Sequence, residues 1–281
     1  MHLPFQHSIL PPLKKITGGW AQPTLTFIFI TLCIGINLLP YQKITAEYLW
    51  QKTYNDTVAL FLYPSNIQFR FSIAEYYLSN AGYDIEKAKK RYQEVINEDP
   101  SFYLAHFQLA RIYFIQGKPA LAMDHIRTVL KLQPDFKQGY YLYGLISGFS
   151  DNTTEAIYGF EEYMKRDDFN WAGYNDLAWV YFRSGRFEKS LELAKKGLEK
   201  SPGNPWLLNM QGLSLMNLGE HEQAHVVFTL AKESSEKLTP EIWGKSYPGN
   251  DPKIYAAGLQ KMQEAINHNL NLTKNTKDAS Y

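Results

Sequence analysis

Cysteine is nearly absent from this chain, and charge of one sign does not dominate. The single cysteine, Cys33, lies inside an apolar run, which excludes a disulfide framework, a CxxC redox pair and a cysteine-rich zinc site. The 29 basic residues almost balance the 28 acidic ones, so the net charge of +1 creates no field that would attract a phosphate backbone. We therefore expect no nucleic-acid partner.

The motifs of common enzyme classes are also lacking. The sequence contains no glycine-rich phosphate loop, no GxSxG nucleophile elbow and no cysteine outside the apolar run. We therefore expect that the protein is not an enzyme, and that it uses no cofactor and no small-molecule substrate. One motif, HEQAH, points the other way.

One long apolar run stands near the N-terminus. Residues 23–41 read PTLTFIFITLCIGINLLPY, and no charged residue occurs between Lys15 and Lys43. At a rise of about 1.5 Å per residue, this run is just long enough to cross a hydrocarbon core of roughly 30 Å. Lys14 and Lys15 precede the run, whereas Lys43 is soon followed by Glu47, which favours a cytoplasmic N-terminus. We predict a transmembrane helix over 23–41, after a short N-terminal tail over 1–22.

A cleaved signal peptide is the competing interpretation of this run. Ile44-Thr45-Ala46 resembles a small-residue cleavage site after an apolar stretch. The segment from Met1 to Trp20 is long for the charged region of a signal peptide, so we favour an uncleaved anchor.

A fixed period marks the middle of the chain. Segments end every 34 residues, at Pro100, Pro134, Asp168, Pro202 and Glu236. Two columns of small residues share this period, and small residues allow two helices to approach closely. The first column is Ala74, Ala110, Gly144, Ala178 and Gly212, and the second is Ala88, Ala122, Ala156, Ser190 and Ala224. Large rings stand three places after the first column at Tyr77, Tyr113 and Tyr181.

Turn residues agree with this period. Gly117, Gly185 and Gly219 each stand between the two expected helices of a unit, where glycine can adopt a positive φ. The third unit has Asp151 in place of this glycine. The period, the small columns and the turn glycines together predict stacked helical hairpins.

This pattern resembles the tetratricopeptide-repeat family, whose period is 34 residues. The resemblance covers roughly residues 66–237 and divides them into five units, 66–100, 101–134, 135–168, 169–202 and 203–236. It implies an all-α fold, a right-handed superhelix of helical hairpins. With the flanking segments, we expect an N-terminal transmembrane helix before it and a C-terminal capping helix after it.

The flanks of the repeats have helical patterns of their own. We expect a connecting helix within 42–65. A Pro/Gly loop and a capping helix are expected over 238–270, with Asp251 as the N-cap and Pro252 at the first helical position. An amphipathic helix at this place would cover the last apolar face of a solenoid. Trp243 and Tyr247 could instead form a lid over a binding site, which is the alternative role, and residues 271–281 are expected to be disordered.

The sequence His221-Glu222-Gln223-Ala224-His225 satisfies the HExxH pattern of zinc proteases. The same residues already have places in the fifth repeat, because LGEHEQAHVVF aligns with SGRFEKSLELA one period earlier. Ala224 belongs to the second small column, and no third ligand is evident. We interpret the motif as a coincidence and expect no metal site.

The resemblance also implies where a partner binds. In this family the first helices of the units line a concave groove that holds partner peptides. Aromatic rings there supply contact area, and Asn and Arg supply directed hydrogen bonds. The groove residues predicted on this basis are Phe107, Arg111, Phe114, Tyr141, Phe149, Asn175, Trp179, Arg183, Trp206, Asn209 and Asn217. The lysine and asparagine clamp of chaperone-binding members is not present, since Phe107 and Tyr141 stand at two of its positions.

We therefore expect a membrane-anchored scaffold or adaptor that binds another protein or an extended peptide in this groove, in the assembly of the cell envelope. The N-terminus would be cytoplasmic, and the repeats would lie outside the inner membrane of a bacterial-type cell. A receptor or co-chaperone on an organelle membrane, with its repeats in the cytosol, is the alternative. A zinc metallohydrolase acting through HEQAH is a second and weaker one.

Overall fold

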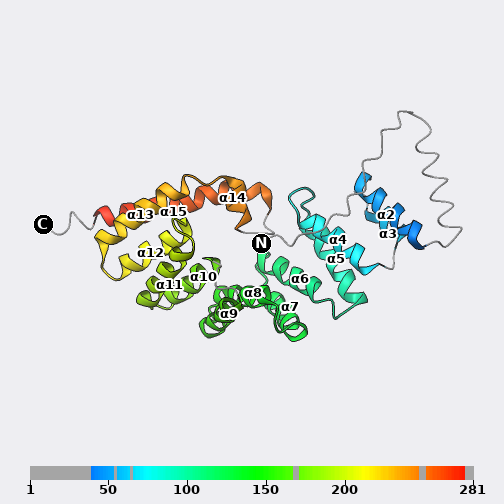
Figure 1. The fold of residues 1–281 in the computed structure, drawn as a ribbon, viewed down its shortest axis with the longest axis horizontal. Helices are drawn as coiled ribbons and strands as arrows, with labels where there is room; N and C mark the ends of the chain where they lie inside the picture. Colours follow the sequence, from blue (N-terminus) through cyan, green and yellow to red (C-terminus); the bar gives the residue numbers. More distant parts are fainter. Residues whose placement is uncertain (1–38, 54–55, 64–65, 167–170, 247–250, 276–281) are drawn as a thin grey trace, which may run out of the picture. The chain divides into compact units, whose positions relative to one another are not determined.

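The computed structural model describes residues 39–53, 56–63, 66–166, 171–246 and 251–275, and all regular structure within them is helical (Figure 1). The prediction of an all-α fold is thus confirmed. The chain divides into two compact units, Met1–Asn66 and Ile67–Tyr281.

The first unit contains two helices, α2 (Leu39–Thr53) and α3 (Asp56–Leu62), where the sequence predicted one connecting helix. They pack against each other, and Ala46, Leu49, Ala59 and Leu62 are buried. The last three residues of the predicted membrane segment belong to α2, and residues 23–38 lie outside the described part of the chain. Within the residues that the structure describes, no helix has both the length and the apolarity needed to cross a membrane.

The second unit begins with five successive helical pairs (Figure 1). The pairs are α4 (Ile67–Leu78) with α5 (Ile85–Glu98), α6 (Tyr103–Ile115) with α7 (Pro119–Leu132), α8 (Lys137–Phe149) with α9 (Thr153–Arg166), α10 (Trp171–Arg183) with α11 (Phe187–Lys200), and α12 (Pro205–Asn217) with α13 (His221–Ser235). The two helices of each pair pack against each other, and each pair packs against the next. Each predicted unit contains one pair.

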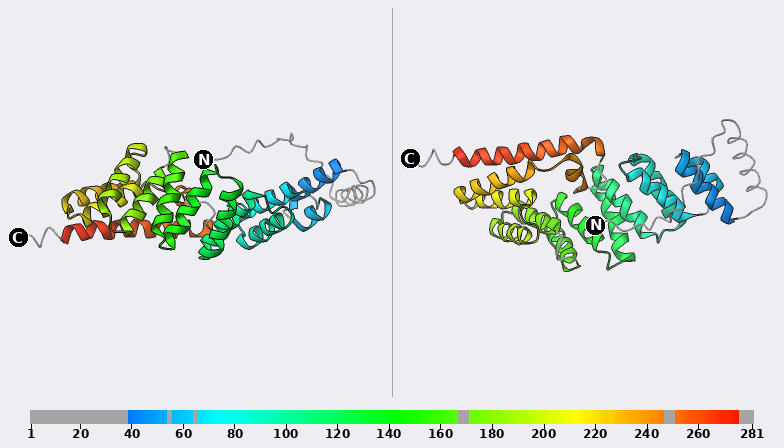
Figure 2. Two further views of the ribbon diagram at one scale, coloured as in Figure 1. Left: turned by 90° about the horizontal axis from the view of Figure 1, so that it is seen from below. Right: turned by 45° about the horizontal axis from the view of Figure 1, so that its top comes forward.

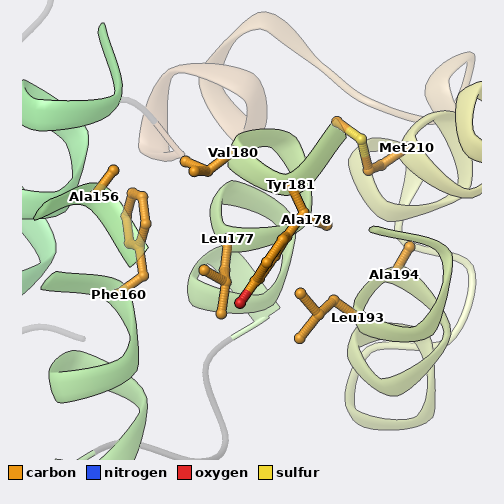
Figure 3. Packing of buried hydrophobic residues seen from close by; sticks show 9 residues of the cluster. All are labelled: Ala156, Phe160, Leu177, Ala178, Val180, Tyr181, Leu193, Ala194 and Met210. Carbon is orange, nitrogen blue, oxygen red and sulfur yellow. The ribbon is translucent and has the colours of Figure 1, made fainter. Parts of the chain in front are cut away.

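The small columns lie where the two helices of a pair meet. The first-column residues are buried against a second-helix column of Tyr92, Ile126, Phe160, Ala194 and Phe228, all of them fully buried. Glycine occurs opposite phenylalanine: a Cβ on Gly144 would lie 2.9 Å from the Phe160 ring, and one on Gly212 would lie 2.6 Å from the Phe228 ring. In these two pairs the glycine therefore makes room for the ring, as close packing requires. Figure 3 shows the buried cluster that includes Phe160, Ala178 and Ala194.

The turns between paired helices have left-handed backbone. Gly117, Gly185 and Gly219 have φ values of 67°, 74° and 81°. Asp151, at the same position in the third pair, has a φ of 60°. Aspartate tolerates this region better than most residues with a side chain, so the turn persists without glycine.

The chain ends with α14 (Pro240–Lys245), a single 3-10 turn η1 (Pro252–Ile254) and α15 (Tyr255–Asn275). Asp251 caps η1 by accepting a hydrogen bond from the Lys253 amide at 2.9 Å. α15 runs beside α13, where Ile266 and Leu270 join the buried cluster of the fifth pair (Figures 1 and 2). The helix ends five residues later than predicted, so residues 271–275 are helical and were wrongly assigned to a disordered tail.

Candidate peptide-binding surface

Three aromatic rings from three successive pairs form a row. Phe149, at the end of α8, lies between Phe114 of α6, with centroids 5.4 Å apart, and Trp179 of α10, with centroids 4.9 Å apart. The guanidinium of Arg183 stands over the Trp179 ring at 5.3 Å. We call these four residues, Phe114, Phe149, Trp179 and Arg183, the aromatic strip.

The strip is open to solvent at its centre. Phe149 is 60% exposed, whereas Phe114 and Trp179 are half-buried and Arg183 is exposed. Burying one large apolar side chain stabilises a fold by about 1.5–3 kcal/mol, so the exposed ring contributes little of this to folding. Apolar side chains exposed in a contiguous patch are typical of interaction surfaces.

Arg183 also makes an ion pair with the turn residue of the preceding repeat. Its Nη2 lies 2.6 Å from Oδ1 of Asp151. Both side chains are exposed, so the pair adds little stability, but it holds the guanidinium above the ring of Trp179.

Phe107, Arg111 and Tyr141, also predicted for the groove, are engaged within the fold. Phe107 meets the Phe136 ring edge-on, with centroids 5.1 Å apart. The guanidinium of Arg111 donates to Oε1 of Gln108 at 2.5 Å, and burial lowers its pKa against the opposing effect of the Glu75 carboxylate.

Tyr141 contacts a carboxyl group, that of Asp176, which was not predicted from the sequence. Its hydroxyl donates to Oδ2 of Asp176 at 2.6 Å, and the Asn175 amide donates to Oδ1 of Asp176 at 3.0 Å. Burial raises the pKa of Asp176 to about 6, partly opposed by these two hydrogen bonds. A signal existed in the sequence, because no other repeat has an acidic residue in this column, whose other members are Ser72, Gln108, Leu142 and Met210.

The C-terminal segment contacts two of the predicted groove residues, Trp206 and Asn209, both on α12. Trp206 stacks at 5.2 Å on Trp171 and packs against a buried cluster of Trp243, Tyr255 and Leu259. The side chain of Asn209 accepts a hydrogen bond from Asn269 of α15 at 3.1 Å. Asn217 stays exposed and donates to the backbone carbonyl of Leu213 in its own helix.

The start of α15 also touches the first pair. The Tyr255 hydroxyl donates to Oδ1 of Asn80, in the turn after α4, at 3.2 Å. Trp243, considered above as a lid residue, is only 8% exposed, and Tyr247 lies outside the described residues.

The HEQAH residues serve the packing of α13. Ala224 is fully buried, Glu222 is exposed, and Nδ1 of His225 lies 2.9 Å from Oγ1 of Thr273 on α15. The Thr273 hydroxyl donates its proton to the Leu270 carbonyl, so His225 is the donor in the first bond. Across the described residues, no group of three or more His, Cys, Asp or Glu side chains is placed to hold a metal ion.

Comparisons with known proteins agree with this geometry. Two tetratricopeptide-repeat family models match residues 171–204 and 81–135. Tetratricopeptide repeat protein 21A of Homo sapiens is 25% identical over 190 residues, which is 65% of this chain but only 14% of that protein's length. Residues 81–135 and 171–204 thus belong to the tetratricopeptide-repeat family.

Solved structures show the same fold. The crystal structure of the MamA protein matches with a TM-score of 0.54 and 22% identity, covering 61% of this chain and 92% of that one. PilW, described as a widely conserved type IV pilus biogenesis factor, matches with a TM-score of 0.56 and 16% identity, covering 76% of this chain and 93% of that one. At these identities the likeness concerns the fold.

Proposed function

We propose that this tetratricopeptide-repeat protein is a scaffold or adaptor that binds an extended, partly apolar segment of a partner protein along the aromatic strip. The observation that carries the proposal is the 60% exposure of Phe149 within a row of rings spaced 4.9 and 5.4 Å apart. Large rings of this kind supply most of the binding energy in protein interfaces, because they bury a large area and lose little rotamer freedom.

The charge arrangement favours a neutral segment over an acidic one. Arg183 is the cation of the strip, and Asp151 already neutralises it at 2.6 Å. An entering carboxylate would have to displace Asp151, whereas an apolar or proline-rich segment can stack on Phe149 and Trp179 without breaking the pair. The chain would therefore act by binding rather than by catalysis.

A photo-crosslinking experiment tests the strip. Phe149 is replaced by p-benzoylphenylalanine in cells, and the same replacement at Tyr158, an aromatic residue on α9 that is 50% exposed, serves as the matched control. We expect a discrete crosslinked partner at position 149 and none at position 158, and we expect Trp179→Ala with Arg183→Ala to abolish it. Equal crosslinking at both positions, or crosslinking that survives the double substitution, would refute the proposal.

We further propose that residues 23–41 hold the chain in a membrane and that the repeats work outside it, in cell-envelope assembly. The support is the uncharged run between Lys15 and Lys43 and the positive charge before it. PilW, which shares the fold, is described as a pilus biogenesis factor.

Reporter fusions at both ends test this topology. A cytoplasmic reporter active at the N-terminus and silent after Tyr281 is the expected result. Activity after Tyr281 would place the repeats in the cytosol and favour an organelle receptor or co-chaperone. The mass of the mature chain reports separately on cleavage near Ala46.

A further inference from the structure

The carboxyl group of Asp176 is held between two successive repeats. The Tyr141 hydroxyl, from α8, donates to its Oδ2 at 2.6 Å, and the neighbouring Asn175 amide donates to its Oδ1 at 3.0 Å. Asp176 is half-buried, so part of the residue is open to solvent. A carboxylate has about four acceptor positions, and these two neutral donors use only two of them. The other positions can accept further hydrogen bonds.

The Asp176 carboxylate has no counter-charge among the described residues. Burial raises its pKa to about 6, opposed by its two hydrogen bonds and by no cation. The group is therefore ionised at neutral pH. Two other carboxylates of the repeats do have cations, because Asp151 pairs with Arg183, and the charge of Glu75 acts to raise the pKa of Arg111. Asp176 is thus a half-buried anion that no cation in the described part of the chain neutralises.

Packing of the repeats does not require a carboxylate at this position. A half-buried charge without a counter-charge destabilises a fold, because it loses part of its hydration. Ionisable groups in such surroundings cluster at functional sites. The other repeats have uncharged residues in this column, namely Ser72, Gln108, Leu142 and Met210. Asp176 is therefore a candidate binding group rather than a packing residue.

Asp176 lies next to the aromatic strip. It precedes Trp179 by three residues on α10, and side chains three apart on a helix have Cβ atoms about 5–6 Å apart. An extended segment advances about 3.3 Å per residue. A segment that stacks on the strip can therefore bring a side chain one or two residues further along to Asp176.

We propose that Asp176 binds a cationic side chain of the partner segment, arginine or lysine, one or two residues from the apolar residue on the aromatic strip. The unused acceptor positions of the carboxylate take its N–H donors, and charge-assisted hydrogen bonds of this kind are about twice as strong as neutral ones. The amide oxygen of Asn175, whose nitrogen already binds Asp176, offers another acceptor. That the cation belongs to the partner rests on the proposed function, whereas cation binding at Asp176 does not.

Cation binding is measured with the full-length protein and two probes of equal shape. n-Propylguanidinium is the side chain of arginine, and n-propylurea is its neutral counterpart. The protein carries fluorotryptophan, and fluorine NMR follows the signal of Trp179, which Trp179→Phe identifies. We expect n-propylguanidinium to shift this signal saturably, with at least about fivefold higher affinity than n-propylurea. No saturable shift, or equal affinity for both probes, overturns the inference.

Variants place the binding. Asp176→Asn removes the charge and keeps the shape of the side chain, so we expect the affinity for n-propylguanidinium to fall at least about fivefold. Glu188→Gln, which removes an exposed carboxylate from α11, is the matched control and should leave the affinity unchanged. Asp151→Asn tests the other carboxylate near Trp179, and a loss there as large as in Asp176→Asn overturns the location. If Asp176→Asn does not fold, the comparison of the two probes decides together with Asp151→Asn.

The partner's cation is tested in cells with p-benzoylphenylalanine at position 149. Asp176→Asn should lower the yield of the crosslinked partner at least about fivefold, and Glu188→Gln should leave it unchanged. Asp176→Lys should abolish crosslinking, because it places a second cation opposite the first. Glutamate in place of the arginine or lysine of the crosslinked segment should restore crosslinking in Asp176→Lys. An unchanged yield in Asp176→Asn overturns the assignment of the cation to the partner.

The two proposals fail in different ways. Crosslinking from position 149 that disappears in the Trp179 and Arg183 double variant but persists in Asp176→Asn supports the strip and overturns the role of Asp176. A saturable guanidinium shift that requires Asp176, without any crosslinked partner, supports the cation site and overturns the proposed function.

Discussion

Arg183 reaches from the end of α10 to Asp151, the turn residue of the preceding repeat, and the two side chains meet at 2.6 Å. Asp151 stands where three other repeats have glycine, with a backbone φ of 60°. In the third repeat the turn therefore has a strained backbone at Asp151, and the Asp151 carboxylate orients the guanidinium of Arg183 in the aromatic strip.

Substitutions at Asp151 should separate strain from charge. Asp151→Gly relieves the left-handed strain and loses an exposed ion pair worth about 0.2–1 kcal/mol, so we expect the free energy of unfolding to change by less than about 1 kcal/mol. Asp151→Val puts a β-branched residue at positive φ and should destabilise by about 2 kcal/mol. Urea denaturation measures both, and equal destabilisation by the two variants would contradict this account.

Gly144 should not tolerate a methyl group. A Cβ there would stand 2.9–3.0 Å from three atoms of the Phe160 ring, so we expect Gly144→Ala to lower the free energy of unfolding by about 1–3 kcal/mol. Adding Phe160→Leu should recover part of this loss, because the two residues share one volume. Independent, additive effects in a double-mutant cycle would disprove the coupling.

Features repeated every 34 residues could be predicted from the sequence, and features that depend on one distant contact could not. Gly144 and Phe160 are sixteen residues apart within one unit, so their packing follows from the period. The hydrogen bond from Asn269 to Asn209 joins residues sixty positions apart, and nothing in the repeat pattern indicates that α15 reaches α12. Tyr141 and Phe149 looked alike as groove candidates, yet the first bonds to the half-buried Asp176 and the second is 60% exposed.

Stability near pH 5 should reflect groups that act in opposite directions. Nδ1 of His106 lies 2.9 Å from Nδ1 of His125, and burial, then His106, lowers the pKa of His125 from 6.5 to about 4. Stabilisation by neutral His125 is therefore complete above pH 6.5 and is lost as the pH falls toward 4. Asp176, whose pKa is raised by burial from 3.8 to about 6, acts in reverse. Its contribution is complete below pH 3.8 and is lost as the pH rises through 6.

Variants separate these two effects. Relative to the wild type, His125→Gln should gain stability as the pH falls from 6.5 to 4, and Asp176→Asn should lose stability as the pH falls from 6 to 3.8. Unfolding free energies measured at several pH values give both differences. If the difference in unfolding free energy between a variant and the wild type does not change with pH, the substituted group does not titrate as described.

The HEQAH motif should bind no zinc at stoichiometric level, because His225 donates to Thr273 and takes part in packing α15 against α13. His225→Ala and Thr273→Val should each destabilise the fold by about 1 kcal/mol and together by less than the sum of the two. Metal analysis of the purified chain is the direct measurement. One zinc per chain that disappears in His225→Ala would revive a metal site.

We expect α15 to stabilise the repeats only through the side chains that it packs against them. Ile266 is 1% exposed and packs in the cluster with Leu208 and Phe228, whereas Leu272 on the same helix is 40% exposed. We expect Ile266→Ala to cost about 2–5 kcal/mol, the usual effect of a cavity in a core, and Leu272→Ala to cost less than about 1 kcal/mol. Both substitutions leave the length of α15 unchanged and have similar effects on helix propensity. The difference between their unfolding free energies therefore measures what the packing of α15 on the repeats contributes. If Ile266→Ala costs no more than Leu272→Ala, then α15 does not close the last apolar face of the solenoid.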